Sequence, residues 1–424
     1  MRISNASFLL LFLFFVSCQN TKVTACPAPK GTSCPPCKIQ NKEDKTISSK
    51  PPKPMKKNYN CSLDLVAGRI LNGKKKYWNR QKFNLNKKPS NFIKMGKFSR
   101  ITSTPLINGN KIFFGDHTGN INSVSLIDGN FKTNWKYKTG DKIWGDPILS
   151  RDGKTLYSGS DDDHLYAISV DSGKLLWKIR IWECSPAKGA DPEKVRCDID
   201  GSLFLDSTGN VIVGGAGVAS VSPEGKVIFL FKVKSHVRGG ITADNEGNLF
   251  FATLGGEIIS ISSSGKERFR YSVRGQCDSR PLLAGCLVIT GCDDNAIHAL
   301  NRETGKLVWK FIGSDDFRHS GAFSEDTIYW GGNDGYIYAI DLKGNIKWRY
   351  NAGGRVLAGI SVNDTGETIF GCENRNIFHL NSSGNLKWNI RLKDIPDTTV
   401  SIMDNGIILG TWKGTLLYAD SGEK

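Results

Sequence analysis

The stretch Gly305-Lys306-Leu307-Val308-Trp309 decides the fold, because related phrases recur along most of the 424-residue chain. Gly173-Lys174-Leu175-Leu176-Trp177 is a close copy, and weaker copies end at Trp135, Phe229, Phe269, Trp348 and Trp388. The aromatic residues follow one another at intervals of about 40 residues, a period typical of repeat arrays. We expect each ring to fill the space between neighbouring units, so we interpret the tryptophans as packing residues.

A short turn with flanking alternation of apolar and polar residues precedes each aromatic residue. Alternation with a period of two predicts strands on both sides of the turn. The turn residues mostly tolerate a positive φ, and they are Thr118-Gly119, Asp162-Asp163, Gly255-Gly256, Asp294-Asn295, Asp334-Gly335, Asn374-Arg375 and Lys413-Gly414, with a distorted copy around Gly217. Each unit therefore predicts four short antiparallel strands, which is one blade of a propeller.

The two ends of the chain are expected to complete one blade together. The last turn, at Gly414, lacks a fourth strand, whereas Gly73-Lys74-Lys75-Lys76-Tyr77-Trp78 resembles a fourth strand without a blade. Joining them would remove two exposed sheet edges. We predict an all-β, eight-bladed propeller of four-stranded antiparallel blades, with the last blade closed by an N-terminal strand near Trp78.

Residues 299–309 resemble the Ala-x-Asp-x-x-Thr-Gly-x-x-x-Trp repeat of pyrroloquinoline-quinone-type propellers, and residues 167–177 and 339–348 are similar. This resemblance spans about residues 61 to 424 and implies two alternatives. One is a quinone-dependent dehydrogenase or a sugar-binding propeller, which would use pyrroloquinoline quinone and calcium. The other is a BamB-like lipoprotein, which uses the ring as a scaffold for outer-membrane β-barrel assembly. The dehydrogenases are known for two adjacent cysteines beside the cofactor, and no two cysteines are adjacent in this chain.

No catalytic or metal-binding constellation is expected from the motifs. The six histidines include no pair at ligand spacing. Asp161-Asp162-Asp163 offers the oxygen ligands that calcium prefers, but it lies at a predicted hairpin tip, where acidic residues are common turn formers. We therefore favour a non-enzymatic protein without a cofactor.

The first 60 residues predict export and membrane attachment. Residues 1–17 have the layout of a secretory signal, and Phe15-Val16-Ser17-Cys18 resembles a bacterial lipobox, which implies lipidation of Cys18. Residues 18–60 are rich in Lys, Pro, Asn and Ser, so we predict a disordered basic tether. Residues 61–424 would form the propeller. We expect a lipid anchor in the outer membrane, with the domain facing the periplasm or the cell surface; a plain signal peptide or an uncleaved anchor is the alternative.

The net charge of +16 is concentrated before the repeats. Residues 101–424 hold 36 basic and 38 acidic residues, a net charge of −2. Nucleic-acid binding needs a basic face on the fold, so this distribution argues against it. The basic tether is suited to an anionic membrane surface, or it is simply a solvated run. We expect a monomeric propeller with an envelope protein as its partner.

The eleven cysteines leave ten after lipidation of Cys18, an even number that suits an oxidising compartment. A turn at Ala284-Gly285 would place Leu283 opposite Cys286 and Cys277 opposite Cys292, which predicts a disulfide between Cys277 and Cys292. Cys184 and Cys197 bracket the longest insertion and are expected to close it. The pairing of Cys26, Cys34, Cys37, Cys61, Cys286 and Cys372 stays open.

Partner binding is predicted at the loops that lead into the innermost strands. Four of these loops carry arginines at intervals close to the repeat, namely Arg238, Arg280, Arg318 and Arg355. An arc of arginines could hold carboxylates through forked hydrogen bonds, whereas salt bridges to neighbours such as Asp315 and Asp316 are the alternative. Ser235-His236-Val237-Arg238-Gly239 is also similar to the Leu-x-Leu-Arg-Gly loop that BamB-like proteins present to their assembly partner, which implies a contact role for Arg238 and Gly239.

Overall fold

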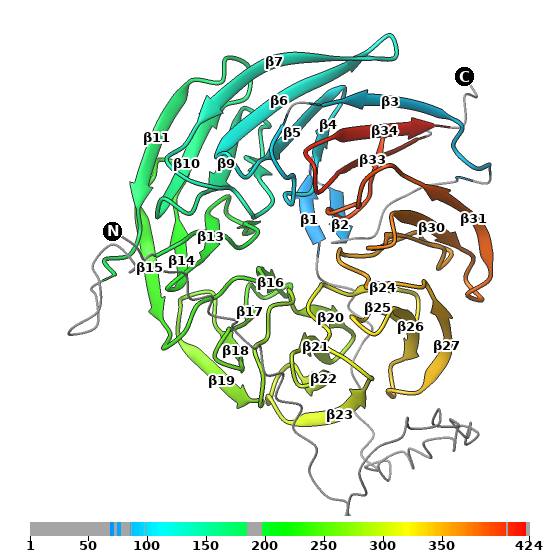
Figure 1. The fold of residues 1–424 in the computed structure, drawn as a ribbon. Helices are drawn as coiled ribbons and strands as arrows, with labels where there is room; N and C mark the ends of the chain where they lie inside the picture. The colour runs from blue at the N-terminus through cyan, green and yellow to red at the C-terminus, as the bar shows by residue number, and fades with distance from the viewer. Residues whose placement is uncertain are drawn as a thin grey trace, which may run out of the picture. The chain divides into compact units, whose positions relative to one another are not determined.

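Eight four-stranded antiparallel sheets are arranged as the blades of a propeller around a common centre (Figure 1). The computed structural model describes residues 68–71, 74–77, 85, 87–96, 98–184, 197–403 and 406–420, all within one compact unit. The signal segment, Cys18 and the tether lie outside these residues. In the described part of the chain, no helix has the length and apolar character needed to cross a membrane.

The first four blades follow the chain from residue 106 to residue 272. Blade A contains β4 (Leu106–Asn108), β5 (Lys111–Gly115), β6 (Asn120–Ile127) and β7 (Asn130–Lys138). Blade B contains β8 (Ile148–Leu149), β9 (Thr155–Gly159), β10 (His164–Ser169) and β11 (Leu175–Arg180). Blade C contains β12 (Phe204–Leu205), β13 (Val211–Gly214), β14 (Gly217–Val221) and β15 (Val227–Lys232). Blade D contains β16 (Ile241–Ala243), β17 (Leu249–Ala252), β18 (Glu257–Ile261) and β19 (Glu267–Ser272).

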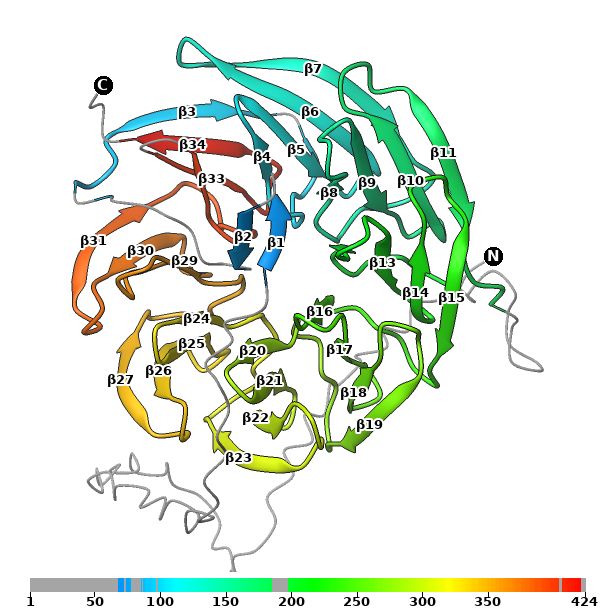
Figure 2. The ribbon, with the colours of Figure 1, turned by 180° about the vertical axis from the view of Figure 1, so that it is seen from behind.

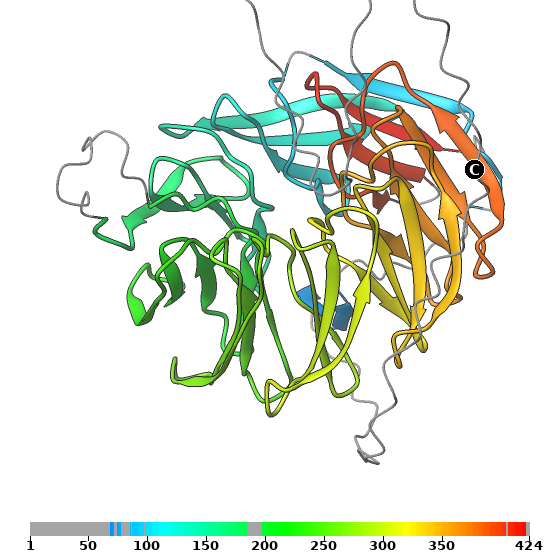
Figure 3. The ribbon, with the colours of Figure 1, turned by 60° about the horizontal axis from the view of Figure 1, so that its bottom comes forward.

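The other four blades complete the ring. Blade E contains β20 (Leu282–Ala284), β21 (Leu287–Cys292), β22 (Ala296–Asn301) and β23 (Leu307–Ile312). Blade F contains β24 (Ala322–Ser324), β25 (Thr327–Gly331), β26 (Tyr336–Asp341) and β27 (Ile346–Asn351). Blade G contains β28 (Ser361–Val362), β29 (Thr368–Gly371), β30 (Asn376–Leu380) and β31 (Leu386–Arg391). Blade H joins β32 (Ser401–Met403), β33 (Gly406–Gly410) and β34 (Leu416–Asp420) to β3 (Asn91–Met95). The inner strand of each blade lies next to the centre and its outer strand lies at the rim of the ring, as Figure 1 and the tilted view of Figure 3 show. The repeat aromatics belong to the outer strands.

The predicted hairpin turns are confirmed by the backbone. Residues in most of these turns have a positive φ, including Gly119, Asp163, Asn295 and Gly335. Arg375, which stands where the other repeats have a more permissive residue, also adopts a φ of 70°. The turns hold the second and third strands of each blade in antiparallel register.

The recurring Gly-Lys-x-x-Trp phrase is explained by the contact between consecutive blades. The ring of Trp135 in blade A covers Gly173 in blade B, where an added Cβ would lie 2.6 Å from the ring. The same contact pairs Trp177 with Gly225, Phe229 with Gly265, Phe269 with Gly305, Trp309 with Gly344 and Trp348 with Gly384. The four indoles also donate from Nε1 to carbonyl oxygens of the next blade at 2.8–2.9 Å. The prediction that these aromatics fill the space between blades is confirmed.

The expected position of the closing strand was wrong. An N-terminal strand does complete blade H, but it is β3, whose Asn91–Met95 pair with Leu416–Asp420. Ile93 and Met95 on this strand pack against blade A, and Ile93 lies over Gly129 as the tryptophans lie over their glycines. The lysine-rich β2 (Lys74–Tyr77) pairs instead with β1 (Gly68–Leu71), and Trp78 lies outside the described residues. Apolar alternation, which β2 lacks, decides which segment closes the ring.

Both predicted disulfides are present. Cys184 and Cys197 have Cα atoms 5.7 Å apart, and those of Cys277 and Cys292 are 4.3 Å apart. The register behind the second prediction was wrong, because Ala284 pairs with Leu287 and the turn falls at Gly285-Cys286. The disulfide still forms, because Cys277 lies in the loop before β20 and its position does not depend on how β20 pairs with β21. Cys286 is also disulfide-bonded, and Cys372 is a buried free thiol.

Candidate binding site at the centre of the ring

A cavity of about 640 Å³ lies where the loops that precede the inner strands converge. All eight blades contribute to its wall. The four predicted arginines and Gly239 all line this cavity, together with residues that were not predicted to bind a partner, among them Arg100, Trp144, Asp146, Asp161, Asp198, Asp200 and Trp412. The repeat spacing of the arginines was therefore a valid guide to their convergence.

Three of the arginines are paired with carboxylates. Arg238 forms a fork with Asp278, with Nε at 2.9 and 3.0 Å from the two oxygens. Arg318 binds Asp293 at 2.8 Å and Asp316 at 3.4 Å, and Arg355 binds both oxygens of Glu373 at 2.7 and 2.8 Å. The hydrogen bond that Arg238 donates to Asp278 raises the pKa of Arg238, and the one that Arg318 donates to Asp293 raises the pKa of Arg318. The salt-bridge alternative is thus what the structure shows, while each guanidinium stays about half exposed.

Arg280 and Gly239 have a different role in the wall. The Arg280 side chain is buried beneath Gly240, where an added Cβ would lie 2.6 Å from its Nε. A Cβ on Gly239 would lie 2.5 Å from the carbonyl oxygen of Asp278 in the next loop. Gly239 and Gly240 therefore let the neighbouring loop and the Arg280 side chain approach the backbone closely, which glycine allows because it lacks a side chain.

The opposite side of the cavity is acidic. Blades B and C contribute Asp146, Asp161, Asp198 and Asp200, and in a ring of eight these blades face blades F and G, which carry Arg318 and Arg355. Asp146 accepts a hydrogen bond from the Thr104 amide at 2.6 Å, and Asp200 binds His236 Nε2 at 2.7 Å. Burial lowers the pKa of His236, but the hydrogen bond and charge of Asp200 outweigh it, so the net shift is upward.

Asp161 is the most perturbed group of this acidic side. Its Oδ2 accepts a hydrogen bond from Trp144 Nε1 at 2.9 Å, whereas its buried Oδ1 has no hydrogen-bond partner in the described structure. Burial raises the pKa of Asp161 to about 7, and the charges of Asp198 and Asp200 act in the same direction. The other two members of the aspartate triplet do serve the turn, since Asp162 accepts a hydrogen bond from the His164 amide and Asp163 adopts a positive φ.

Asp161→Asn is expected to raise the free energy of unfolding at pH 8 by about 1–3 kcal/mol. The folded-state pKa of Asp161 lies above the ordinary carboxyl value of 3.8, so its contribution to stability is lost as the pH rises from about 4 through about 7. The gain should therefore vanish near pH 4, where the wild-type carboxyl is protonated. Urea unfolding at both pH values measures the difference, and an equal gain at pH 4 and pH 8 would contradict this account.

An arginine held between two indoles marks the border between blades H and A. The Arg100 guanidinium lies 3.3 Å from the Trp412 ring centroid and 5.7 Å from that of Trp144. It also binds Asp397 through Nε at 2.5 Å. The His117 ring packs at a tilt against the Trp144 ring, and burial together with the charges of Arg100 and Lys142 lowers the pKa of His117 to about 4.

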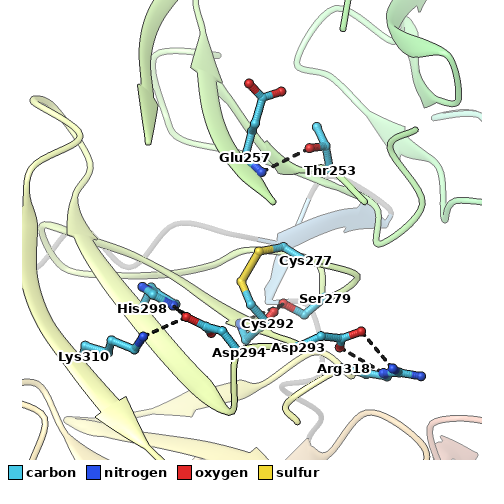
Figure 4. The surroundings of a disulfide bond; sticks show 11 residues. Thr253, Glu257, Cys277, Ser279, Cys292, Asp293, Asp294, His298, Lys310 and Arg318 are labelled. Atoms are coloured by element: carbon cyan, nitrogen blue, oxygen red, sulfur yellow. Dashed lines mark hydrogen bonds and ion pairs between the residues drawn. A yellow bond between two sulfur atoms is a disulfide. The ribbon is translucent and has the colours of Figure 1, made fainter. Parts of the chain in front are cut away.

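One cluster of metal-ligand type lies in blade E, away from the cavity wall (Figure 4). Cys292, Asp294 and His298 place their ligand atoms within 4.8 Å of one another. The sulfur of Cys292 is bonded to Cys277, while Asp294 binds His298 at 3.1 Å and Lys310 at 2.7 Å. A cysteine binds metals as a thiolate, and Cys292 cannot form one while it is bonded to Cys277. We therefore interpret this group as a disulfide beside the ion pair of Asp294 and Lys310.

The family model described as outer membrane protein assembly factor BamB matches residues 55–179, 214–355 and 293–422. No curated protein matches the sequence. Among solved structures, BamB from Moraxella catarrhalis is similar, with a TM-score of 0.61 and 13% identity over 78% of this chain and 99% of that chain. A europium-containing methanol dehydrogenase has a TM-score of 0.61 and 12% identity, covering 77% of this chain and 93% of its own. A quinohemoprotein alcohol dehydrogenase from Comamonas testosteroni has a TM-score of 0.66 and 11% identity, and the match covers 80% of this chain and 77% of the dehydrogenase.

These structural likenesses show the fold alone, since branches with different activities share the ring. The family model is more informative, because its three matches together span well over half of the chain. The eight-bladed ring and the repeat phrase agree with it. The chain therefore belongs to the family described as outer membrane protein assembly factor BamB.

Proposed function

We propose that this protein is a non-enzymatic lipoprotein scaffold of the bacterial cell envelope, whose propeller binds a protein component of outer-membrane assembly. The observation that carries the proposal is the row of Arg238, Arg318 and Arg355 along one side of the central cavity. Each guanidinium is held in place by a carboxylate and remains about half exposed. An arginine has five N–H donors, so a paired side chain still offers donors to a partner.

Membrane attachment through Cys18 is part of the same proposal. It is supported by the lipobox resemblance of Phe15-Val16-Ser17-Cys18 and by membership in the family. Gln19 follows Cys18, and the absence of the Asp that resembles an inner-membrane retention signal favours the outer membrane. Cell fractionation with lipid labelling, comparing the wild type with Cys18→Ser, checks this part.

Arg238→Glu is expected to reduce co-purification of the envelope partner at least tenfold, because it places a carboxylate where the partner would meet a guanidinium. Arg391→Glu is the matched control, since Arg391 is exposed on the outer strand of blade G and far from the cavity wall. Quantitative pull-down from cross-linked cells measures the difference, and urea unfolding verifies that both variants fold. Equal recovery of the partner with Arg238→Glu and Arg391→Glu would count against the proposal.

The alternative function is a quinone-dependent dehydrogenase or a sugar-binding propeller, which the likeness to two dehydrogenases favours at the level of the fold. The carboxylates of the cavity wall are of the ligand type that calcium prefers, but among the described residues that line the cavity there is no cysteine. The residues present thus do not match the cysteine-flanked quinone site that the resemblance implies, and we derive no step through that cofactor. Equilibrium dialysis with pyrroloquinoline quinone and calcium separates the two functions.

A further inference from the structure

We propose that the outer surface of blades B and C binds an anionic lipid surface, through exposed aliphatic residues of β11 and β15 and the lysines beside them. We call this surface the rim patch, and its aliphatic members are Leu175, Leu176, Val227, Ile228 and Leu230. Figure 2 shows β11 and β15 at neighbouring places on the rim of the ring. Among the described residues that line the central cavity there is no member of the rim patch, so the inference goes beyond the proposed function and does not depend on it.

The outer strand of blade C differs from those of the other repeats. In the other six blades with a repeat aromatic, the residue after the aromatic is basic or an asparagine, namely Lys136, Lys178, Arg270, Lys310, Arg349 and Asn389. Blade C has Leu230 at this place and Ile228 directly before its aromatic, and these side chains are 44% and 59% exposed. Of the seven blades, blade C alone has large aliphatic residues on both sides of the aromatic.

The other blades bind the polar residues at these two places to their own strands and turns. Blades D to G form ion pairs of 2.6–2.8 Å, which are Arg270–Glu257, Lys310–Asp294, Lys347–Asp326 and Lys387–Glu367. Asn134 in blade A donates to two serine hydroxyls, and the Lys178 ammonium in blade B lies 5.7 Å from the Tyr166 ring centroid. Aliphatic side chains that point to solvent give blade C no such contact, so the stability of the blade does not explain them.

The aliphatic residues of the two strands meet at one contact between blades. Leu175 and Leu176 begin β11, and Leu176 is 53% exposed. The next residue, Trp177, covers Gly225 and donates to the Pro223 carbonyl at 2.9 Å, in the turn that leads into Val227. The rim patch therefore extends over two neighbouring blades, as an apolar surface that binds a partner or a membrane does.

The charge beside the patch is positive. Lys226, Lys232 and Lys234 are exposed, and none of them forms an ion pair with a residue that the structure describes. The acidic residue of this segment is Glu224, which is hydrogen-bonded to Ser222, so residues 222–235 hold three lysines and one carboxylate, a net charge of +2.

The carboxylates of the flanking blades do not reverse this charge. Asp171, which precedes β11, binds Lys111, and Asp163 of the same blade binds Arg180. On the other side, Glu267 of β19 binds Arg270. The rim patch thus combines aliphatic side chains with uncompensated lysines, which is complementary to an anionic surface.

The residue types favour a lipid surface over a strand of a partner protein. Protein interfaces are enriched in aromatic residues and arginine and depleted of lysine, whereas the rim patch has aliphatic residues and lysines. Lysines and bulges on an edge strand also oppose pairing with a further strand, and β15 ends at Lys232 and shifts register against β14. At a membrane, the aliphatic side chains can enter the boundary of the acyl chains while the ammonium groups bind lipid phosphates.

The test places the photoreactive residue benzoylphenylalanine at Ile228 of the full-length protein, which is mixed with vesicles of equimolar phosphatidylcholine and phosphatidylglycerol. Leu386 is the matched control position, because it begins the outer strand of blade G, across the ring from blade C, and is 46% exposed. Both proteins carry the same residues 1–60, so membrane attachment through that segment is equal. We expect at least tenfold more crosslinked lipid from position 228, as measured by mass spectrometry.

The charge dependence is tested in the same assay. Replacing Lys226, Lys232 and Lys234 by serine should reduce the lipid crosslink from position 228 at least threefold, and vesicles of phosphatidylcholine alone should do the same, because both changes remove the attraction between lysines and anionic headgroups. Urea unfolding verifies that each variant folds. Equal crosslinking from positions 228 and 386, no dependence on phosphatidylglycerol, or crosslinking of position 228 in intact cells to a protein in place of lipid would overturn the proposal. Arg238→Glu tests a different surface, so the two proposals fail separately.

Discussion

Trp330→Ala is expected to lower the free energy of unfolding by about 3–5 kcal/mol, the typical cost of truncating a large buried aromatic side chain. Trp330 on β25 is fully buried and belongs to a core cluster that joins blades E and F. Its indole lies against two glycines: a Cβ on Gly321 would lie 2.2 Å from the ring, and one on Gly291 would lie 2.9 Å from Nε1. Backbone that approaches this closely cannot collapse easily into the space left by alanine.

Trp330→Phe is the informative control. The indole Nε1 of Trp330 is buried and has no hydrogen-bond partner in the described structure, so removing it relieves an unsatisfied donor. We expect the phenylalanine variant to lose about half as much stability as the alanine variant or less. Urea unfolding followed by far-ultraviolet circular dichroism measures both. Equal losses for the two variants would show that the indole N–H has a favourable contact.

Arg100→Met is expected to lower the free energy of unfolding at pH 8 by about 2–4 kcal/mol, because it leaves the Asp397 carboxylate buried without its cation. The side chain of Asp397 is only 3% exposed, whereas Arg100 is 26% exposed, so the cost is below that of a fully buried pair. Methionine keeps apolar contact with the Trp412 ring. The double variant Arg100→Met/Asp397→Asn should recover most of the loss.

The pH dependence of the Arg100 variant distinguishes charge from packing. Burial raises the pKa of Asp397 even though Arg100 opposes it, and removing Arg100 would raise that pKa further. A raised carboxyl pKa means that stability is lost as the pH rises through the folded-state value. The deficit of Arg100→Met should therefore shrink at pH 4. A deficit that is the same at pH 4 and pH 8 would assign the effect to lost contacts with Trp412 and Trp144.

The architecture was predictable because it repeats. The turn recurs from blade to blade, and seven of the eight blades carry a tryptophan or phenylalanine at the same place on the outer strand, so errors in one copy are corrected by the others. The closing strand occurs once, and there the prediction chose the segment ending at Trp78 because it contains a tryptophan. The structure uses Ile93 instead, since a strand also needs alternating apolar residues that face the neighbouring blade.

The candidate site was predictable only in part, for the same reason. Arg238, Arg318 and Arg355 recur with the blade and could be grouped from their spacing. Their carboxylate partners lie in a loop of the next blade, in the turn of the preceding blade and in the turn of the same blade, respectively, at separations of 18 to 40 residues. Asp146, Asp161, Asp198 and Asp200 occupy different positions in their repeats, so no period connects them. Asp161 is also hidden in a triplet whose other two members form a turn.

The contact between each aromatic ring and the glycine of the next blade has a consequence for how such a chain can change in length. Each repeat of about 40 residues carries both an aromatic residue for the next blade and a glycine for the aromatic residue of the preceding blade. A whole repeat can therefore be inserted or removed while the remaining contacts between blades keep their chemistry. The junctions at the ends are different: Trp388 donates to the Leu85 carbonyl at 3.0 Å, and Ile93 covers Gly129. A ring with one blade more or fewer would keep the Trp388–Leu85 and Ile93–Gly129 contacts as the two blade contacts that differ from the repeated one.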